Sequence, residues 1–308
     1  MNSDSIRPNS LQAWILACRP QTLPAAAAPI LIGTGLLLMN PQTKLAIGPT
    51  FICFGFALLM QIASNLINDL FDFLKGTDRE DRLGPKRCCA QGWITPKAMK
   101  WGIFINLLLA ALVGSLALLY AYKQSPYHGL EFIFVGILCM AFAFFYTTGP
   151  YPLSYHGWGD VLVMAFFGFI PVGGTYWIQT YQWTPEVTIA ALVCGMVVDT
   201  LLVLNNYRDR AQDLMSGKKT VVVRFGEPFG RYLYGGLGIF ACWMCLAFLF
   251  GGHLFAALLP QFYLFFHFST WRKMIRIRAG RELNAVLGLT GRNIFIFALL
   301  LFAGMALA

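Results

Sequence analysis

Residues 46–72 read AIGPTFICFGFALLMQIASNLINDLFD, an apolar run that ends in a cluster of amides and acids. The apolar part, 46–68, is long enough at about 1.5 Å per residue to cross the ~30 Å hydrocarbon core of a bilayer. Four polar side chains near its end have i, i+3, i+4, i+7 spacing, which places them on one helix face: Asn65, Asn68, Asp69 and Asp72. This stretch predicts a membrane-spanning helix with a polar stripe at one end.

The rest of the chain has the same character. Of its 308 residues, 57% are hydrophobic and only 12% are charged, whereas a soluble domain carries roughly 25% charged residues. Soluble enzymes, secreted disulfide scaffolds and disordered chains are therefore excluded. Apolar stretches long enough to span a membrane occur at 23–39, 46–68, 101–122, 130–149, 161–180, 187–206, 232–251, 253–271 and 290–308. We expect an all-α polytopic membrane bundle of nine transmembrane helices, forming a single domain over 1–308.

The positions of the basic residues indicate the orientation. If the amino terminus is cytosolic, all Lys and Arg except Lys44 and Lys123 fall on the cytosolic side of a nine-span chain. Adding or removing one span would scramble this distribution, so the positive-inside rule favours nine spans. The net charge of +9 is then explained by the cytosolic loops, and we expect no nucleic-acid partner.

A second polar stripe occurs in the second half of the chain. Asp199, Asn206, Asp209 and Asp213 gather on one face of the span at 187–206 and its continuation. Both stripes are predicted at cytosolic ends of spans, so the chain is expected to consist of two similar halves.

Carboxylates at a membrane boundary cost a few kcal/mol unless they are paired, hydrated or metal-bound. Three partners fit: the protein's own Lys and Arg, a transported cation or proton, or Mg²⁺ bound to a phosphate substrate. The bases that follow each acid cluster favour the third, because a metal-bound pyrophosphate needs donors for its remaining charge. These bases are Arg79, Arg82, Lys86 and Arg87 after the first cluster, and Arg208, Arg210, Lys218, Lys219 and Arg224 around the second.

Four segments carry a resemblance to a known family: Arg19 to Pro24 (RPQTLP), Asn68 to Asp78 (NDLFDFLKGTD), Arg82 to Arg87 (RLGPKR) and Asn205 to Thr220 (NNYRDRAQDLMSGKKT). The chain resembles the UbiA superfamily of intramembrane aromatic prenyltransferases, with aspartate-rich motif one at 65–87 and motif two at 205–224. Gly84-Pro85-Lys86-Arg87 stands where the 4-hydroxybenzoate enzymes typically place Arg-Pro-Leu. This difference favours the branch that uses 1,4-dihydroxy-2-naphthoate.

The resemblance implies an Mg²⁺-dependent enzyme of menaquinone biosynthesis in the bacterial inner (plasma) membrane, with its active-site loops in the cytosol. The implied partners are a polyprenyl diphosphate, 1,4-dihydroxy-2-naphthoate and the lipid bilayer, and we expect no obligate protein partner. A different aromatic acceptor, such as 4-hydroxybenzoate, or a cation-coupled carrier are the alternatives.

The resemblance also assigns residues. The expected catalytic acids and metal ligands are Asp69, Asp72, Asp209 and Asp213, with Asp78 as a further metal ligand. The expected substrate-binding residues are Arg19, Asn65, Asn68, Lys86, Arg87, Tyr146, Asn206, Arg208, Lys218 and Lys219.

Overall fold

The computed structural model describes residues 6–76, 82–122 and 124–308, and in these ranges all regular elements are helical. The long helices are α2 (Leu23–Met39), α3 (Ile47–Leu74), α4 (Pro96–Ala121), α5 (Leu130–Thr147), α8 (Pro185–Met215), α9 (Val221–Cys245) and α12 (Leu283–Ala306). Shorter elements are α1 (Leu11–Cys18), η2 (Pro20–Thr22), η3 (Leu153–Tyr155), α6 (Gly159–Val163), η4 (Met164–Phe169), α7 (Ile170–Thr180), η5 (Leu246–Gly251), α10 (Leu254–Leu258), η6 (Leu259–Phe262) and α11 (Tyr263–Ile277).

Local sequence explains where several helices begin. The hydroxyl groups of Thr95 and Thr220 accept hydrogen bonds from the first-turn amides of α4 and α9, which satisfies backbone donors that have no partner within the helix. Pro96 and Pro185 occupy the first positions of α4 and α8, where a missing N–H costs nothing. These residues mark the starts of α4, α8 and α9.

In the described part of the chain, eight helical segments are long and apolar enough to cross a membrane. The predicted span at 253–271 is the exception, because it forms the three consecutive pieces α10, η6 and α11 around Pro260. These pieces form the run Leu254–Ile277 between η5 and α12.

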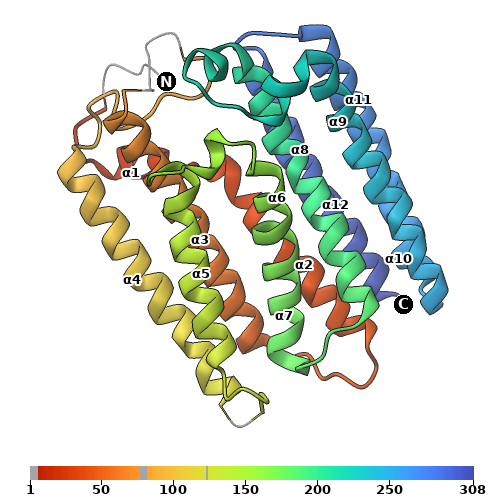
Figure 1. Ribbon diagram of the computed structural model, residues 1–308. Helices are drawn as coiled ribbons and strands as arrows, with labels where there is room; N and C mark the ends of the chain where they lie inside the picture. Colours follow the sequence, from red (N-terminus) through yellow and green to blue (C-terminus); the bar gives the residue numbers. More distant parts are fainter. Residues whose placement is uncertain (1–5, 77–81, 123) are drawn as a thin grey trace.

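The two helices that carry the motifs are longer than the sequence indicates. The predicted spans end at 68 and 206, but α3 continues to Leu74 and α8 to Met215. Asp69, Asp72, Asp209 and Asp213 therefore lie on helices, at the end of the bundle where α1 also lies (Figure 1).

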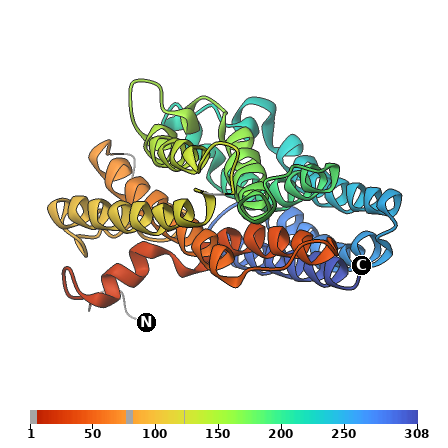
Figure 2. The ribbon, with the colours of Figure 1, turned by 90° about the horizontal axis from the view of Figure 1, so that it is seen from below.

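The interior of the bundle is built around α2 and α8. Their buried side chains include Ile32, Leu36, Val193 and Val197. Seen along the bundle, α2 lies beside α12 (Figure 2), and the two helices pack together closely. The outer helices α4 and α5 instead expose apolar side chains such as Leu119, as expected for a surface that faces lipid.

Candidate active site

The two amides of motif one tie the end of α3 to its neighbours. Asn65 Nδ2 donates hydrogen bonds to the carbonyl oxygen of Cys18 and to Thr22 Oγ1, each at 3.0 Å. Asn68 Oδ1 accepts one from the hydroxyl of Thr147 at the end of α5. Asn65 is therefore held by the segment that precedes α2, and Asn68 by the end of α5.

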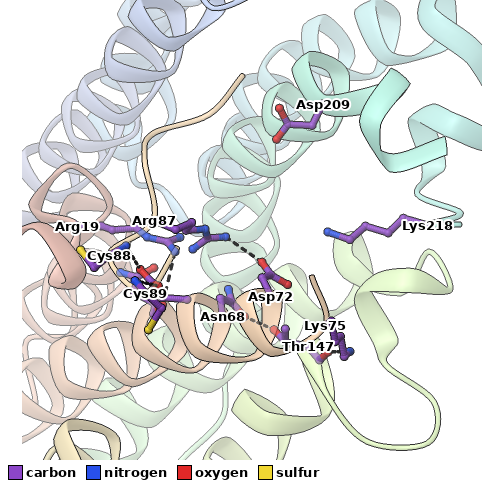
Figure 3. A network of polar contacts seen from close by, with 12 residues as sticks. Arg19, Asn68, Asp72, Lys75, Arg87, Cys88, Cys89, Thr147, Asp209 and Lys218 are labelled. Atoms are coloured by element: carbon purple, nitrogen blue, oxygen red, sulfur yellow. Dashed lines mark hydrogen bonds and ion pairs between the residues drawn. The ribbon is translucent and has the colours of Figure 1, made fainter. Parts of the chain in front are cut away.

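Asp69 has a different environment from the one predicted. Its carboxylate oxygens each accept a backbone N–H, from Cys88 and from Cys89, both at 2.9 Å (Figure 3). The side chain is buried, with 1% of the residue exposed. Hydrogen bonds to a carboxylate are stronger than neutral ones, so Asp69 fixes the turn that follows Arg87. Asp69 therefore positions this turn, and its role as a metal ligand stays a prediction.

Asp72 lies one turn further along α3 and forms an ion pair with Arg87. The distance from Arg87 Nη2 to Asp72 Oδ2 is 3.1 Å, and both side chains are buried. A buried pair of this kind is costly to break, because removal of one partner leaves the other charge uncompensated. Asp69 holds the neighbouring backbone and thereby brings Arg87 to Asp72.

In motif two, Arg208 binds Asp209. Arg208 Nε and Nη2 lie 2.7 and 2.6 Å from the two carboxylate oxygens of Asp209, and Nη1 lies 2.7 Å from Oδ1 of Asn284 on α12. Arg208 is only 3% exposed. The guanidinium therefore orients Asp209, and a role of Arg208 in binding substrate stays a prediction.

Lys218 connects the acids of the two motifs. Its Nζ lies 3.8 Å from Asp213 Oδ1, and in Figure 3 it points toward Asp72. Burial lowers the pKa of Lys218, but the carboxylates of Asp72 and Asp213 outweigh burial and raise this pKa above its ordinary value. Lys218 is therefore a firmly protonated group between the two motifs.

The ring of Tyr155 contacts the ammonium groups of two lysines. Tyr155 in η3 has the ammonium of Lys75 at 4.9 Å and that of Lys218 at 5.1 Å from its ring centroid, within the range of cation–π attraction. Burial lowers the pKa of Lys75, and the carboxylate of Asp72 partly opposes this shift. Sequence analysis missed Lys75 and Tyr155. The position of Lys75, three residues after Asp72 on the same helix face, was the available signal.

Leu83 and Gly84 in motif one contact motif two and α12. Asn284 Nδ2 donates to the carbonyl oxygen of Leu83 at 2.8 Å, and Gln212 Oε1 accepts from the amide of Leu83 at 3.5 Å. A Cβ at Gly84 would lie 2.9 Å from Arg208 Nη2. A larger residue at this position would therefore displace the guanidinium of Arg208.

The remaining predicted residues occupy the same end of the bundle with less defined roles. Lys86 and Lys219 are exposed, and Asn206 on α8 is half-buried. Asp78 lies outside the described residues.

A cavity of about 590 Å³ begins beside the motifs and extends into the bundle between α2, α3, α5 and the run α6–η4–α7. Asn65, Asn68, Tyr146 and Arg19 line its polar end. Most of its remaining lining is aliphatic or aromatic. An insoluble hydrocarbon chain could lie in such a cavity while a charged head group stays with the motifs.

Mg²⁺ is compatible with these donors. Among the described residues, no three His, Cys, Asp or Glu side chains converge to hold a metal ion by themselves. Mg²⁺ commonly uses one or two protein carboxylates and completes its shell with water and substrate phosphate. Asp72, Asp209 and Asp213 supply carboxylates from two helices, next to cations that suit a phosphate. This sparse donor set fits a metal that arrives with its substrate.

Solved structures resemble this fold over nearly the whole chain. A UbiA homologue of Aeropyrum pernix has a TM-score of 0.67 at 14% identity, covering 91% of this chain and 98% of that one. A UbiA homologue of Archaeoglobus fulgidus, bound to GPP and Mg²⁺, has a TM-score of 0.66 at 15% identity and covers 96% and 99%. Likenesses at this identity show the fold alone.

Sequence comparison is more specific. The chain is 37% identical over 232 residues to a protein of Haemophilus influenzae, with 75% of each chain covered. It is 36% identical over 236 residues to one of Escherichia coli, covering 77% of this chain and 75% of the relative. Both relatives are named 1,4-dihydroxy-2-naphthoate octaprenyltransferase. The model of the UbiA prenyltransferase family matches residues 26–287, and the chain belongs to that family.

Proposed function

We propose that this protein transfers a polyprenyl group from polyprenyl diphosphate to 1,4-dihydroxy-2-naphthoate with loss of carbon dioxide, giving demethylmenaquinone and pyrophosphate. The observation that carries the proposal is the meeting of buried acids and bases from two distant motifs at the mouth of an apolar cavity. The names of the relatives at 33–37% identity support this choice of acceptor.

The cations at the motifs bind the diphosphate. Lys75, Arg87 and Lys218 converge from the end of α3, the loop after it and the loop after α8. Exposed Lys86 and Lys219 add donors at the cytosolic edge. Positive charge held at the leaving group stabilises the negative charge that develops as the allylic C–O bond breaks.

Asp72, Asp209 and Asp213 would hold Mg²⁺, with Asp78 as a further proposed ligand and with Asn68 and Asn206 beside them. Bound there, Mg²⁺ supplies Lewis-acid stabilisation of the departing pyrophosphate. The chain's own contribution is to orient these carboxylates. Arg208 orients Asp209, and Asp69 holds the turn that brings Arg87 to Asp72.

The cavity protects the reaction from water. Its apolar lining would hold the prenyl tail and exclude water from the allylic cation. The ring of Tyr146 at its polar end presents an aromatic face that can stabilise positive charge. Because a polyprenyl substrate is insoluble, we propose that the enzyme works in the bacterial plasma membrane with its motif end in the cytosol.

The test uses purified protein with carboxyl-labelled dihydroxynaphthoate and a polyprenyl diphosphate. We expect one carbon dioxide and one pyrophosphate per prenyl group transferred, loss of both when Mg²⁺ is chelated, and little turnover of 4-hydroxybenzoate. A product that keeps its carboxylate would contradict the proposed acceptor chemistry. Cation flux through proteoliposomes without pyrophosphate release would instead support a carrier.

A further inference from the structure

Helix α11 lies at the edge of the bundle, where it packs against α9 and α12 (Figure 1). Its inner face is buried and includes His267 and Met274. Six residues with i, i+3, i+4, i+7, i+8 and i+11 spacing share the opposite, outward face: Phe265, Phe268, Ser269, Arg272, Lys273 and Arg276. They line an open surface pocket of about 400 Å³, called the α11 groove below. The groove therefore faces away from the active-site cavity.

The α11 groove is apolar at one end and basic at the other. Phe265 is 74% exposed, and both it and Phe268 fall within the apolar stretch predicted to span the membrane at 253–271. Arg272, Lys273 and Arg276 follow directly after this stretch, on the last two turns of α11. The phenylalanines are thus at the depth of acyl chains, and the cations at the depth of lipid head groups. A phospholipid has the same order of apolar and charged parts.

The three cations of the groove are not neutralised by the protein. Within 6–76, 82–122 and 124–308, none of their side chains forms an ion pair or a hydrogen bond, and all three are exposed. Arg272 and Arg276 stand one turn apart, where like charges repel. The helix dipole attracts cations only within the last turn, so it does not account for Arg272. An anion at this place would relieve the repulsion.

We propose that the α11 groove binds an anionic phospholipid, with its phosphate at the three cations and an acyl chain along Phe265 and Phe268. A guanidinium binds a phosphate with two parallel hydrogen bonds, and a lysine adds a point charge. A zwitterionic phospholipid carries the same phosphate together with a cationic group, which the three cations repel. The groove therefore selects lipids of net negative charge. This proposal does not depend on the proposed function.

The bound lipid would also steady a segment that contacts both motifs. Directly after α11, the carbonyl oxygen of Arg278 accepts a hydrogen bond from Arg210 Nη1 at 3.0 Å. Arg281 Nη2 donates to the carbonyl oxygen of Arg82 at 3.3 Å. The end of α11 is therefore joined to α8 and to the segment after α3. A phosphate that offsets the repulsion on the last turns of α11 should stabilise this end of the bundle.

The test measures lipid binding by native mass spectrometry. Full-length protein in a neutral detergent is titrated with phosphatidylglycerol and with phosphatidylcholine of identical acyl chains. We expect phosphatidylglycerol to bind at least about tenfold more tightly, the worth of a charge-assisted hydrogen bond. The combined substitution of Arg272→Gln, Lys273→Gln and Arg276→Gln should abolish this preference. Arg272→Lys with Arg276→Lys keeps the charge without the two-pronged geometry and should retain part of it.

A matched control combines Arg7→Gln, Lys97→Gln and Lys100→Gln. These three residues are also exposed and lie outside the groove, so the control changes the net charge of the protein by the same amount. It should keep the preference for phosphatidylglycerol. Because a ligand that binds only the folded protein stabilises it, phosphatidylglycerol should raise the Tm of wild type and control by several degrees more than phosphatidylcholine does. The groove variant should show no such difference.

Three results would overturn the proposal. The first is an unchanged preference in the groove variant, and the second is an equal loss in the control, because the lipid would then respond only to net charge. The third is competition by glycerol phosphate, which has the head group without acyl chains and would mark a site for soluble anions. Thermal unfolding in detergent identifies a variant that has failed to fold. The single substitutions Arg272→Gln and Lys273→Gln then carry the test, each with a partial loss of preference expected.

Discussion

Asp69 and Asp72 stand one turn apart on α3, yet their carboxylates have different partners. Asp69 is bound by two backbone amides of the Cys88–Cys89 turn, and Asp72 by the guanidinium of Arg87. A carboxylate that accepts two buried amides organises a loop, whereas one that faces cations at a cavity mouth can receive a metal with its phosphate. The same residue type therefore has two different sets of contacts within one motif.

Alkylation of Cys88 distinguishes these roles. Its thiol is buried and donates to the carbonyl of Ala13, and burial together with the charge of Asp69 raises its pKa to about 12. We expect Asp69→Asn to loosen the turn and raise the rate of Cys88 alkylation several-fold at neutral pH, measured by mass spectrometry. Asp72→Asn should leave Cys88 protected. An Asp69→Asn protein with full protection of Cys88 and no Mg²⁺-dependent substrate binding would make Asp69 a ligand after all.

Activity measurements should distinguish the acids proposed to hold the metal from other acids of motif one. Asp72→Asn and Asp209→Asn each remove a charge and keep the shape, so each should cost several kcal/mol of transition-state stabilisation, measured as kcat/KM, with insertion nearly intact. Glu80→Gln and Asp81→Asn serve as controls because neither residue belongs to the helical stripe of motif one. Near-normal activity in both aspartate variants would contradict the proposed metal site.

At the level of elements, α12 holds the two motifs together. Asn284 lies near the start of α12. Its Nδ2 donates to the carbonyl of Leu83 in motif one, and its Oδ1 accepts from Arg208 in motif two. These contacts place the segment at 82–84 against α8. The register between the motifs therefore depends on a helix that carries neither of them.

Asn284→Ala should weaken both the fold and the site. The substitution leaves the Leu83 carbonyl and Arg208 Nη1 without this partner, at about 1–3 kcal/mol for a buried group. Asn106→Ala is the matched control, because Asn106 is buried and donates to the carbonyl of Leu59 at 2.7 Å, between α3 and α4. We expect both variants to lower Tm, and only Asn284→Ala to raise the KM for the prenyl diphosphate. Equal KM values would show that α12 does not set the site.

For the whole molecule, the two ends of the bundle differ. Helix α1 and the ends of α3 and α8 that carry the motifs gather at one end of the bundle, and the end of α12 lies at the other (Figure 1). Single cysteines at positions 218, 44 and 308 in a cysteine-free protein test this arrangement in intact cells. We expect an impermeant reagent to label 44 and 308 from outside and to label 218 only after permeabilisation. Labelling of 44 and 218 from the same side would contradict it.

Apolar run length and charge bias by themselves determined the class of this protein. The predicted span 23–39 coincides with α2, and the predicted span 187–206 lies within α8. This succeeds because the free energy of transferring an apolar segment into a bilayer depends on that segment alone, and the bias of Lys and Arg depends on the loops alone. The spacing of Asp72 and Asp213 likewise placed each of them on a polar helix face.

Only the tertiary structure decided which partner each polar side chain has. Nothing in the local pattern separates Asp69 from Asp72, because the difference comes from the turn at Cys88 folding back onto α3. Tyr155 and Asn284 have no periodic signal, and they matter because the fold brings them to Lys218 and Arg208. Hydrogen bonds and ion pairs act over a few ångströms between segments far apart in the chain, so the arrangement of helices, and not their composition, determines them.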